Sequence, residues 1–177
     1  TKGTGMPEYE VRERIRHVCS VLATLHSHGI VHTRLDASKI MLDATGQQVL
    51  IDYVLPPGFY SPQCACTPLH CTAPEVLSLS PYGRAADVWS VGTLVLELIA
   101  NSIHWTTAND LHAFVMSPHH LLPSQIACQG LLSKTGMDFV MGCLRRRPED
   151  RRKLFELQHH PFVRGESPVK EMLSNLD

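Results

Sequence analysis

Four charged side chains lie in two short stretches of the sequence and are the first candidates for chemistry. Arg34, Asp36 and Lys39 fall within residues 32–39, and Asp52 follows the apolar run 49–51. A guanidinium stays protonated and an ammonium has no acceptor, so neither Arg34 nor Lys39 can take up a proton or bind a metal ion. Among these four residues, only the carboxylates of Asp36 and Asp52 could accept a proton or bind a metal ion.

A cluster of thiols with one imidazole is the second candidate. It consists of Cys64, Cys66, His70 and Cys71. Zinc sites usually combine C-x₂₋₄-C with H-x₃₋₅-H, and a C-x-C followed by an adjacent His-Cys does not fit that spacing. We therefore expect no metal ion here. Because no secretory context is visible, we also expect reduced thiols at the six cysteines of the chain, which are Cys19, Cys64, Cys66, Cys71, Cys128 and Cys143.

The charge balance gives no sign of a polyanion as partner. The chain carries 16 basic and 17 acidic residues, a formal net charge of −1, so we expect no nucleic-acid binding by counterion release. The densest basic run, residues 145–152, begins with three arginines, which Glu149 and Asp150 follow. These mixed signs favour a solvated loop with one buried arginine over an anion-binding patch.

Length and composition are typical of one soluble domain. With 177 residues, 44% apolar and 19% charged, the chain can bury a core of its own. The longest apolar stretch, 88–100, contains Glu97 and is shorter than the roughly 20 residues of a membrane helix. Residues 1–5 show no charged-then-apolar signal segment. We expect an intracellular, cytoplasmic protein without a membrane partner.

The charged stretches lie between segments whose patterns predict a helix and a hairpin. Apolar residues recur at spacings of 4, 3, 4 and 3 over 11–25, between Pro7 and Gly29, which predicts an amphipathic helix. Residues 40–42 and 49–51 are short apolar runs on either side of a turn at 43–46, which predicts a small hairpin. Residues 56–74 are rich in proline, cysteine and glycine and are expected to form an extended loop.

The second half of the sequence predicts further helices. Residues 87–99 are apolar almost all round, which predicts a central helix that is buried on every side. Shorter helices are predicted around 111–116, 137–144 and 154–157. The breakers between them are Pro118, Pro123, Pro148 and Pro161. The pattern as a whole is that of a mostly helical domain with one β hairpin.

Five motifs, in the right order, resemble those of the C-terminal lobe of eukaryotic Ser/Thr protein kinases. Residues 25–32 (LHSHGIVH) are similar to the helix and strand before the kinase catalytic loop, and 51–54 (IDYV) stand at the place of D-F-G. Residues 73–75 (APE), 87–92 (DVWSVG), and 143–151 with the closing HPF at 160–162 complete the series. The resemblance implies a mainly α, kinase-like α+β fold: a C-terminal lobe with a small hairpin over residues 1–165, followed by a tail at 166–177.

The structural residues of the family are kept, by this resemblance. Glu75 is expected to pair with Arg151 inside the lobe. Asp87 is expected to accept backbone N–H groups of the catalytic loop, and His32 to pack that loop. The remaining residues of these motifs are Ala73, Pro74, Trp89 and Gly92.

The catalytic residues of the family are replaced. Residues 32–39 read HTRLDASK where the family has H-R-D-L-K-x-x-N. Arg34 therefore stands at the position of the catalytic base, and Lys39 at that of a metal-binding asparagine. Asp36 replaces the lysine that steadies the transferred phosphate, which exchanges an attraction for a repulsion.

Asp52 survives at the position of the family's metal-binding aspartate, but Tyr53 and Val54 follow it in place of Phe-Gly. A β-branched residue lacks the freedom of glycine to adopt φ > 0. We expect Asp52 to form a salt bridge with Lys39, or failing that Arg34, in the space that a Mg²⁺ ion would take. A metal ligand is the alternative role of this carboxylate.

The chain contains neither a G-x-G-x-x-G loop nor a V-A-I-K-like lysine, so the resemblance implies that the N-terminal lobe is absent from it. We expect a catalytically inactive (pseudokinase) lobe that acts as a scaffold or allosteric partner of other proteins, without Mg-ATP. The alternatives are a nucleotide-sensing module and a Ser/Thr kinase with residual phosphotransfer. A glycine loop and a strand lysine upstream of these residues would favour the sensor.

Overall fold

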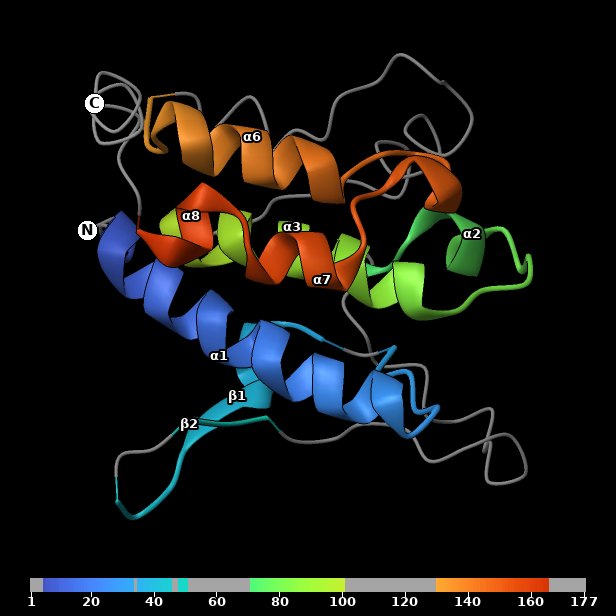
Figure 1. The fold of residues 1–177 in the computed structure, drawn as a ribbon, viewed down its shortest axis with the longest axis horizontal. Helices are drawn as coiled ribbons and strands as arrows, with labels where there is room; N and C mark the ends of the chain where they lie inside the picture. The colour runs from blue at the N-terminus through green and yellow to red at the C-terminus, as the bar shows by residue number, and fades with distance from the viewer. Residues whose placement is uncertain (1–4, 34, 46–47, 51–70, 101–129, 166–177) are drawn as a thin grey trace, which may run out of the picture.

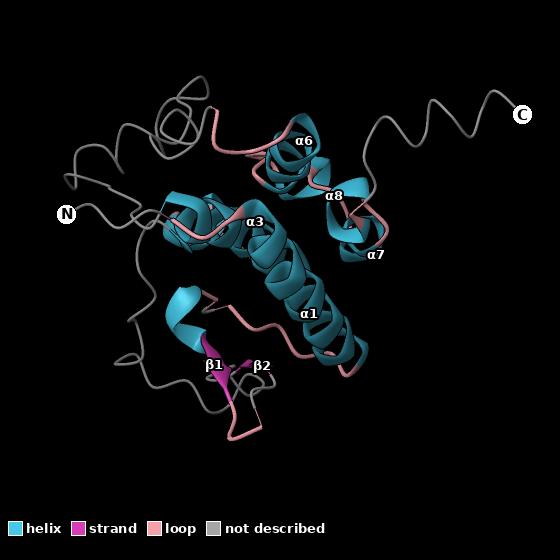
Figure 2. Cartoon of the chain, turned by 90° about the vertical axis from the view of Figure 1, so that its left-hand side faces the viewer, coloured by secondary structure: helices cyan, strands magenta, loops and turns pink. Residues whose placement is uncertain are grey.

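The computed structural model describes residues 5–33, 35–45, 48–50, 71–100 and 130–165. Their elements are α1 (Glu8–Ser27), the 3₁₀ turn η1 (Ala37–Lys39), β1 (Ile40–Leu42), β2 (Gln48–Leu50), α2 (Pro74–Leu77), α3 (Arg84–Ala100), α6 (Lys134–Cys143), the 3₁₀ turn η4 (Pro148–Asp150), α7 (Leu154–Gln158) and α8 (Pro161–Arg164). In Figure 1 the hairpin lies on one side of α1, and α6, α7 and α8 lie on the other. Figure 2 shows the same order from the side, with α1 and α3 between these two groups.

The long helix α1 forms where the apolar spacing predicted it. It begins after Pro7 and ends at Ser27, two residues before Gly29, whose φ of 75° suits glycine. At its start, the carboxylate of Glu8 accepts hydrogen bonds from the backbone N–H of Ser133 (2.7 Å) and from its hydroxyl (2.6 Å). Because Ser133 is the N-cap of α6, these bonds fix the beginnings of α1 and α6 to each other.

The predicted hairpin is confirmed by β1 and β2, which pair antiparallel with Ile40 opposite Leu50. The carboxylate of Asp43 accepts the backbone N–H of Thr45 (2.8 Å) and so supports the turn. The resemblance also implied a strand before the catalytic loop, but residues 30–32 belong to neither helix nor strand in the described part of the chain.

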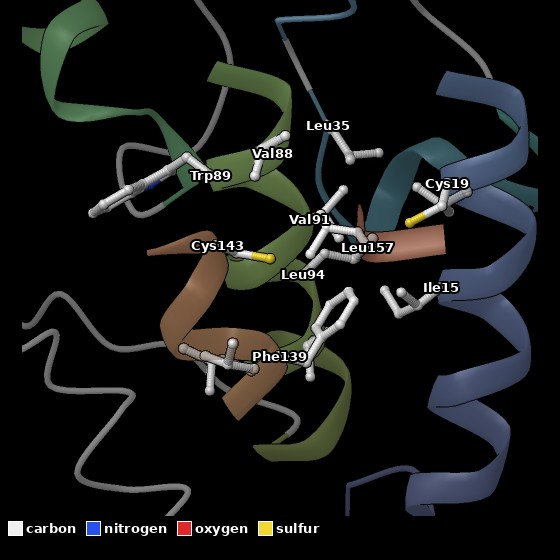
Figure 3. Packing of buried hydrophobic residues seen from close by; sticks show 14 of the residues in the cluster. Ile15, Cys19, Leu35, Val88, Trp89, Val91, Leu94, Phe139, Cys143 and Leu157 are labelled. Atoms are coloured by element: carbon white, nitrogen blue, oxygen red, sulfur yellow. The ribbon is translucent and has the colours of Figure 1, made fainter. Parts of the chain in front are cut away.

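The central helix α3 contacts both α1 and α6. It is longer than predicted at both ends, and most of its residues are buried, Val91 and Leu94 completely. Gly92 permits the close approach of α6, because a Cβ atom there would lie only 2.7 Å from the Cβ of Cys143. Figure 3 shows side chains of α1, α3 and α6 converging in this core, among them Ile15 and Phe139.

Three prolines begin short helical turns where the sequence predicted breakers or loop. Pro74 is the first residue of α2, Pro148 of η4 and Pro161 of α8. The reason is that the first helical position needs no N–H donor and suits the fixed φ of proline. The predicted helix at 137–144 is confirmed by α6 and that at 154–157 by α7, whereas 111–116 lies outside the described residues.

Candidate functional site

Asp87, in the first turn of α3, holds the segment that leads into the predicted catalytic loop. Its side chain is fully buried. One carboxylate oxygen accepts the backbone N–H of His32 (2.8 Å), and the other accepts that of Thr33 (2.7 Å). This is the role that the motif predicted for Asp87. Hydrogen bonds to a carboxylate are among the stronger ones in proteins, so the backbone at 32–33 is fixed to the core helix.

The backbone at Thr33 is held in an unusual conformation. Its φ is 62°, in the left-handed region that β-branched residues avoid. Strain of this kind costs about 1–3 kcal/mol and persists only where other contacts impose it. Here the bond from its N–H to Asp87 and the complete burial of His32 impose it. The backbone conformation of the loop is therefore fixed by the core residues beneath it, in agreement with the packing role predicted for His32.

His26 completes this arrangement, although the sequence reasoning gave it no role. Its Nε2 lies 2.8 Å from the carboxylate of Asp87, and both side chains are buried. The histidine stands in the last turn of α1, so Asp87 joins α1, α3 and the loop at one point. The only available signal was the position of His26 six residues before His32, within the motif 25–32.

Glu75 and Arg151 form the buried ion pair that the motifs predicted. The two guanidinium nitrogens Nη1 and Nη2 each donate to one carboxylate oxygen at 2.7 Å. The Arg151 side chain is fully buried and that of Glu75 is 7% exposed. Arg151 also donates to the backbone carbonyls of residues 145 (2.7 Å), 85 (2.8 Å) and 146 (3.2 Å). The guanidinium thus ties the start of α2 to the start of α3 and to the segment before η4.

The other structural motif residues surround this pair. Ala73 is buried and is the N-cap residue of α2, directly before Pro74. The ring of Trp89 is buried, and the guanidinium carbon of Arg151 lies 5.1 Å from its centroid, a distance suited to a cation–π contact. Together with Gly92 in the contact of α3 with α6, every predicted residue of the structural motifs lies in the core of the lobe.

Asp36 has a different surrounding from the one the sequence suggested. Its carboxylate was expected to face a transferred phosphate and repel it, but the side chain is buried and is the N-cap of η1. One carboxylate oxygen accepts the backbone N–H of Ser38 (2.8 Å) and also the Ser38 hydroxyl. An aspartate before a helical turn readily binds the N–H two residues on, and this local bond draws the charge inward.

Glu97 lies beneath the same turn, and the sequence reasoning missed it. Its carboxylate accepts the backbone N–H of Ala37 (3.0 Å) and lies 3.9 Å from the sulfur of Cys71. Burial raises the pKa of Glu97, and the nearby charge of Asp36 raises it further. Burial also raises the pKa of the Cys71 thiol, so it stays protonated. An acidic residue inside an apolar helix was the available signal.

The predicted salt bridge of Asp52 stays a prediction, because Arg34 and Asp52 lie outside the described residues. Lys39 ends η1 and directly precedes β1. The thiol cluster also falls outside, apart from Cys71. No group of histidine, cysteine and acidic residues able to hold a metal ion occurs within the part of the chain that is described.

Comparison with known proteins identifies the family. The model of the protein kinase domain family matches residues 1–163. Mitogen-activated protein kinase kinase kinase 1 of Arabidopsis thaliana is 31% identical over 171 residues, which is 90% of this chain and 28% of that protein. Mitogen-activated protein kinase kinase kinase 17 of the same plant is 28% identical, over 97% of this chain and 47% of its own length.

A fungal relative gives the same picture: serine/threonine-protein kinase pakA of Talaromyces marneffei is 29% identical, over 94% of this chain and 26% of its own. The chain therefore spans less than half the length of each of these relatives. None of the helices in the described residues is both long and apolar enough to cross a membrane. With the kinase motifs assembled around Asp87 and the Glu75–Arg151 pair, and the family model matching nearly the whole chain, this protein belongs to the protein kinase domain family.

Proposed function

We propose that this lobe is a pseudokinase: it keeps the kinase frame, has lost phosphoryl transfer, and acts by binding other proteins. The observation that carries the proposal is the pair of cations at 34 and 39. Phosphoryl transfer by protein kinases needs a carboxylate to accept the proton of the substrate hydroxyl and an amide oxygen on the second Mg²⁺ ion. Arg34 and Lys39 can supply neither, because both side chains only donate hydrogen bonds.

The register of the loop supports this assignment. Asp87 binds the backbone N–H groups of His32 and Thr33, so Arg34 is the residue directly after two anchored ones. In the family pattern H-R-D-L-K-x-x-N, the third residue is the base. A shift in register would also move His32 out of its buried place. The anchored register therefore supports the assignment of Arg34 to the catalytic position of the family pattern.

The surroundings of Asp36 also support the proposal that the lobe has lost phosphoryl transfer. A lysine at this position would place its charge toward a phosphate, whereas Asp36 is buried and bound to Ser38. The carboxylates of Asp36 and Glu97 bind backbone N–H groups beneath the turn, so position 36 supplies no cation to a phosphate. We infer that the lobe works without Mg-ATP.

The test is a phosphotransfer assay with the protein in the longest form that is expressed. Wild type, Arg34→Asp, Lys39→Asn and the double variant are incubated with labelled ATP, Mg²⁺ and a general protein substrate. We expect no transfer above background from wild type or from either single variant, since each retains one of the two lesions. Phosphate transfer by the wild type that disappears in Asp52→Asn would refute the proposal.

Nucleotide binding is measured separately. Ligand at about 100 times its Kd stabilises a protein by about 2.7 kcal/mol, which thermal unfolding detects easily. We expect no shift in melting temperature with ATP, with or without Mg²⁺. A shift without phosphate transfer would replace the proposal by a nucleotide-sensing module.

A further inference from the structure

A cavity of about 550 Å³ opens between the C-terminal half of α1, the start of α3, η4 and α7. This volume is within the range of specific ligand pockets, which are mostly apolar with a few polar groups at their edges. Ala23, Val88 and Leu154 are among the apolar residues that line it. None of its lining residues belongs to η1, β1 or β2, so the cavity is separate from the predicted catalytic loop and the hairpin.

Two polar side chains in the wall of this cavity are held in place by buried carboxylates. His26 and Arg151 line it, and each is held by a buried carboxylate, His26 by Asp87 and Arg151 by Glu75. A pocket whose wall is fixed by such bonds loses little conformational freedom when it is filled. Phe155 stands at its edge with 69% of its surface exposed and its ring 4.4 Å from that of His159. An exposed aromatic residue beside a preformed cavity is typical of protein interfaces.

The edge of the cavity is basic. Four cations line it, Arg84, Arg151, Arg152 and Lys153, together with one carboxylate, Glu149. Glu75 and Asp138 neutralise Arg151 and Arg152. Arg84 and Lys153 therefore face only Glu149 among the lining residues, a formal excess of one positive charge. Within the described residues, neither Arg84 nor Lys153 forms an ion pair.

We propose that this cavity binds a short acidic peptide segment of a partner protein: one bulky apolar side chain enters it, and neighbouring aspartate or glutamate residues meet Arg84 and Lys153. The apolar lining accounts for the anchor, and the excess of positive charge at the edge accounts for the acidic flanks. The inference rests on the proposed function, because it names the class of partner that a non-catalytic lobe would bind. It assigns a role to the end of the basic run, Arg151 and Arg152 with the following Lys153, which lines the cavity.

The test measures binding of fluorescent synthetic peptides by anisotropy. A set with a central tryptophan, phenylalanine or leucine between acidic residues is compared with the same set between lysines. We expect the acidic set to bind and the lysine set not to. Raising the salt from about 0.05 M to about 0.5 M should weaken the acidic set severalfold, because exposed charges are screened. A short oligonucleotide is measured alongside, and tighter binding of it than of the peptides would overturn the proposal.

Three variants locate the site. Ala23→Met fills the cavity with a helix-favouring side chain, and we expect at least tenfold weaker binding. Arg84→Glu and Lys153→Glu should each weaken the acidic peptides about fivefold, the upper range for one exposed charge pair. Lys134→Glu reverses an exposed charge at the start of α6, away from the cavity, and should change nothing. Unfolding temperatures of all variants exclude misfolding as the cause.

The outcomes separate this inference from the proposed function. If no acidic peptide binds, or if Ala23→Met binds as wild type does, the docking inference is wrong while the inactive-lobe proposal is untouched. If the phosphotransfer assay detects activity instead, the pseudokinase proposal fails whatever the peptides do.

Discussion

Replacing Glu75 by alanine tests the ion pair that holds the lobe together. Arg151 makes five hydrogen bonds, two of them to Glu75 and three to backbone carbonyls. The alanine variant leaves a fully buried guanidinium with three neutral acceptors and no counter-charge. Because the cation stays while its carboxylate is lost, the native state bears an uncompensated charge that the unfolded state exposes to water.

The expected cost follows from these contacts. Removing one partner of a buried ion pair destabilises a protein by about 3–5 kcal/mol. The three carbonyls still solvate part of the charge, which places Glu75→Ala near the lower end, at about 3 kcal/mol. Against a total stability of about 5–15 kcal/mol, this is a large fraction. For a domain of this size, it corresponds to a melting temperature lower by roughly 6–12 °C.

Urea unfolding followed by far-UV circular dichroism measures this cost. Glu149→Ala removes an exposed glutamate in η4 and is the control, which should stay within about 0.5 kcal/mol of wild type. Arg151→Met is the companion variant, and it should cost more than Glu75→Ala because it also strips a donor from three carbonyls. An unchanged midpoint in Glu75→Ala, or Arg151→Met more stable than Glu75→Ala, would refute the reasoning.

Three further predictions concern the frame around the site. Asp87→Asn should cost about 2–3 kcal/mol in urea unfolding, because an amide cannot accept both backbone N–H bonds with the strength of a carboxylate. Leu79→Gly should raise stability by about 0.5–1 kcal/mol in the same measurement, since Leu79 has a φ of 55° and is 93% exposed. Stability should also fall as the pH drops below about 6.5, because burial lowers the pKa of His160 and the folded state then binds fewer protons than the unfolded one. His160→Gln should flatten this part of the melting-temperature profile, whereas an unchanged slope would assign it to another group.

The His160 prediction has a structural reason. Its Nδ1 accepts the backbone N–H of Phe162 (3.2 Å), so the ring proton sits on Nε2, which donates to Asp138 (3.0 Å). A second proton would have to enter on Nδ1, against that N–H. The hydrogen bond from His160 lowers the pKa of Asp138, so this carboxylate adds a second loss of stability at lower pH, as it becomes protonated.

The sequence predicted those parts of the structure that depend on local pattern. The apolar spacing over 11–25 located α1, and the continuous apolar run located α3, because burial on one face or on all faces leaves its period in the sequence. The pairing of Glu75 with Arg151 joins residues 76 positions apart. No periodicity could reveal it, and only the family motifs did.

The sequence could not predict the hydrogen-bond partners of the two buried carboxylates, because these depend on which donor groups lie near them once the chain has folded. Asp36 was expected to face outward, but Ser38, two residues on, offers an N–H and a hydroxyl to its carboxylate. Glu97 was treated only as a charge that interrupts an apolar run, yet it binds the backbone of residue 37. In both cases a backbone N–H binds the carboxylate, and backbone groups are the same for every sequence.

The same fact explains how a kinase lobe can keep its fold when residues of its catalytic loop are replaced. Asp87 fixes the loop through the N–H groups of residues 32 and 33, and Glu97 binds the N–H of residue 37. None of these bonds depends on the side chain at 34, and the new aspartate at 36 makes a bond of its own to Ser38. Substitutions at positions 34 and 36 therefore leave the anchoring bonds intact. From this we expect Arg34→Asp to change the midpoint of urea unfolding by less than Asp87→Asn does, even though position 34 is the catalytic position of the family. The opposite order would mean that the stability of the fold depends on the side chain at position 34.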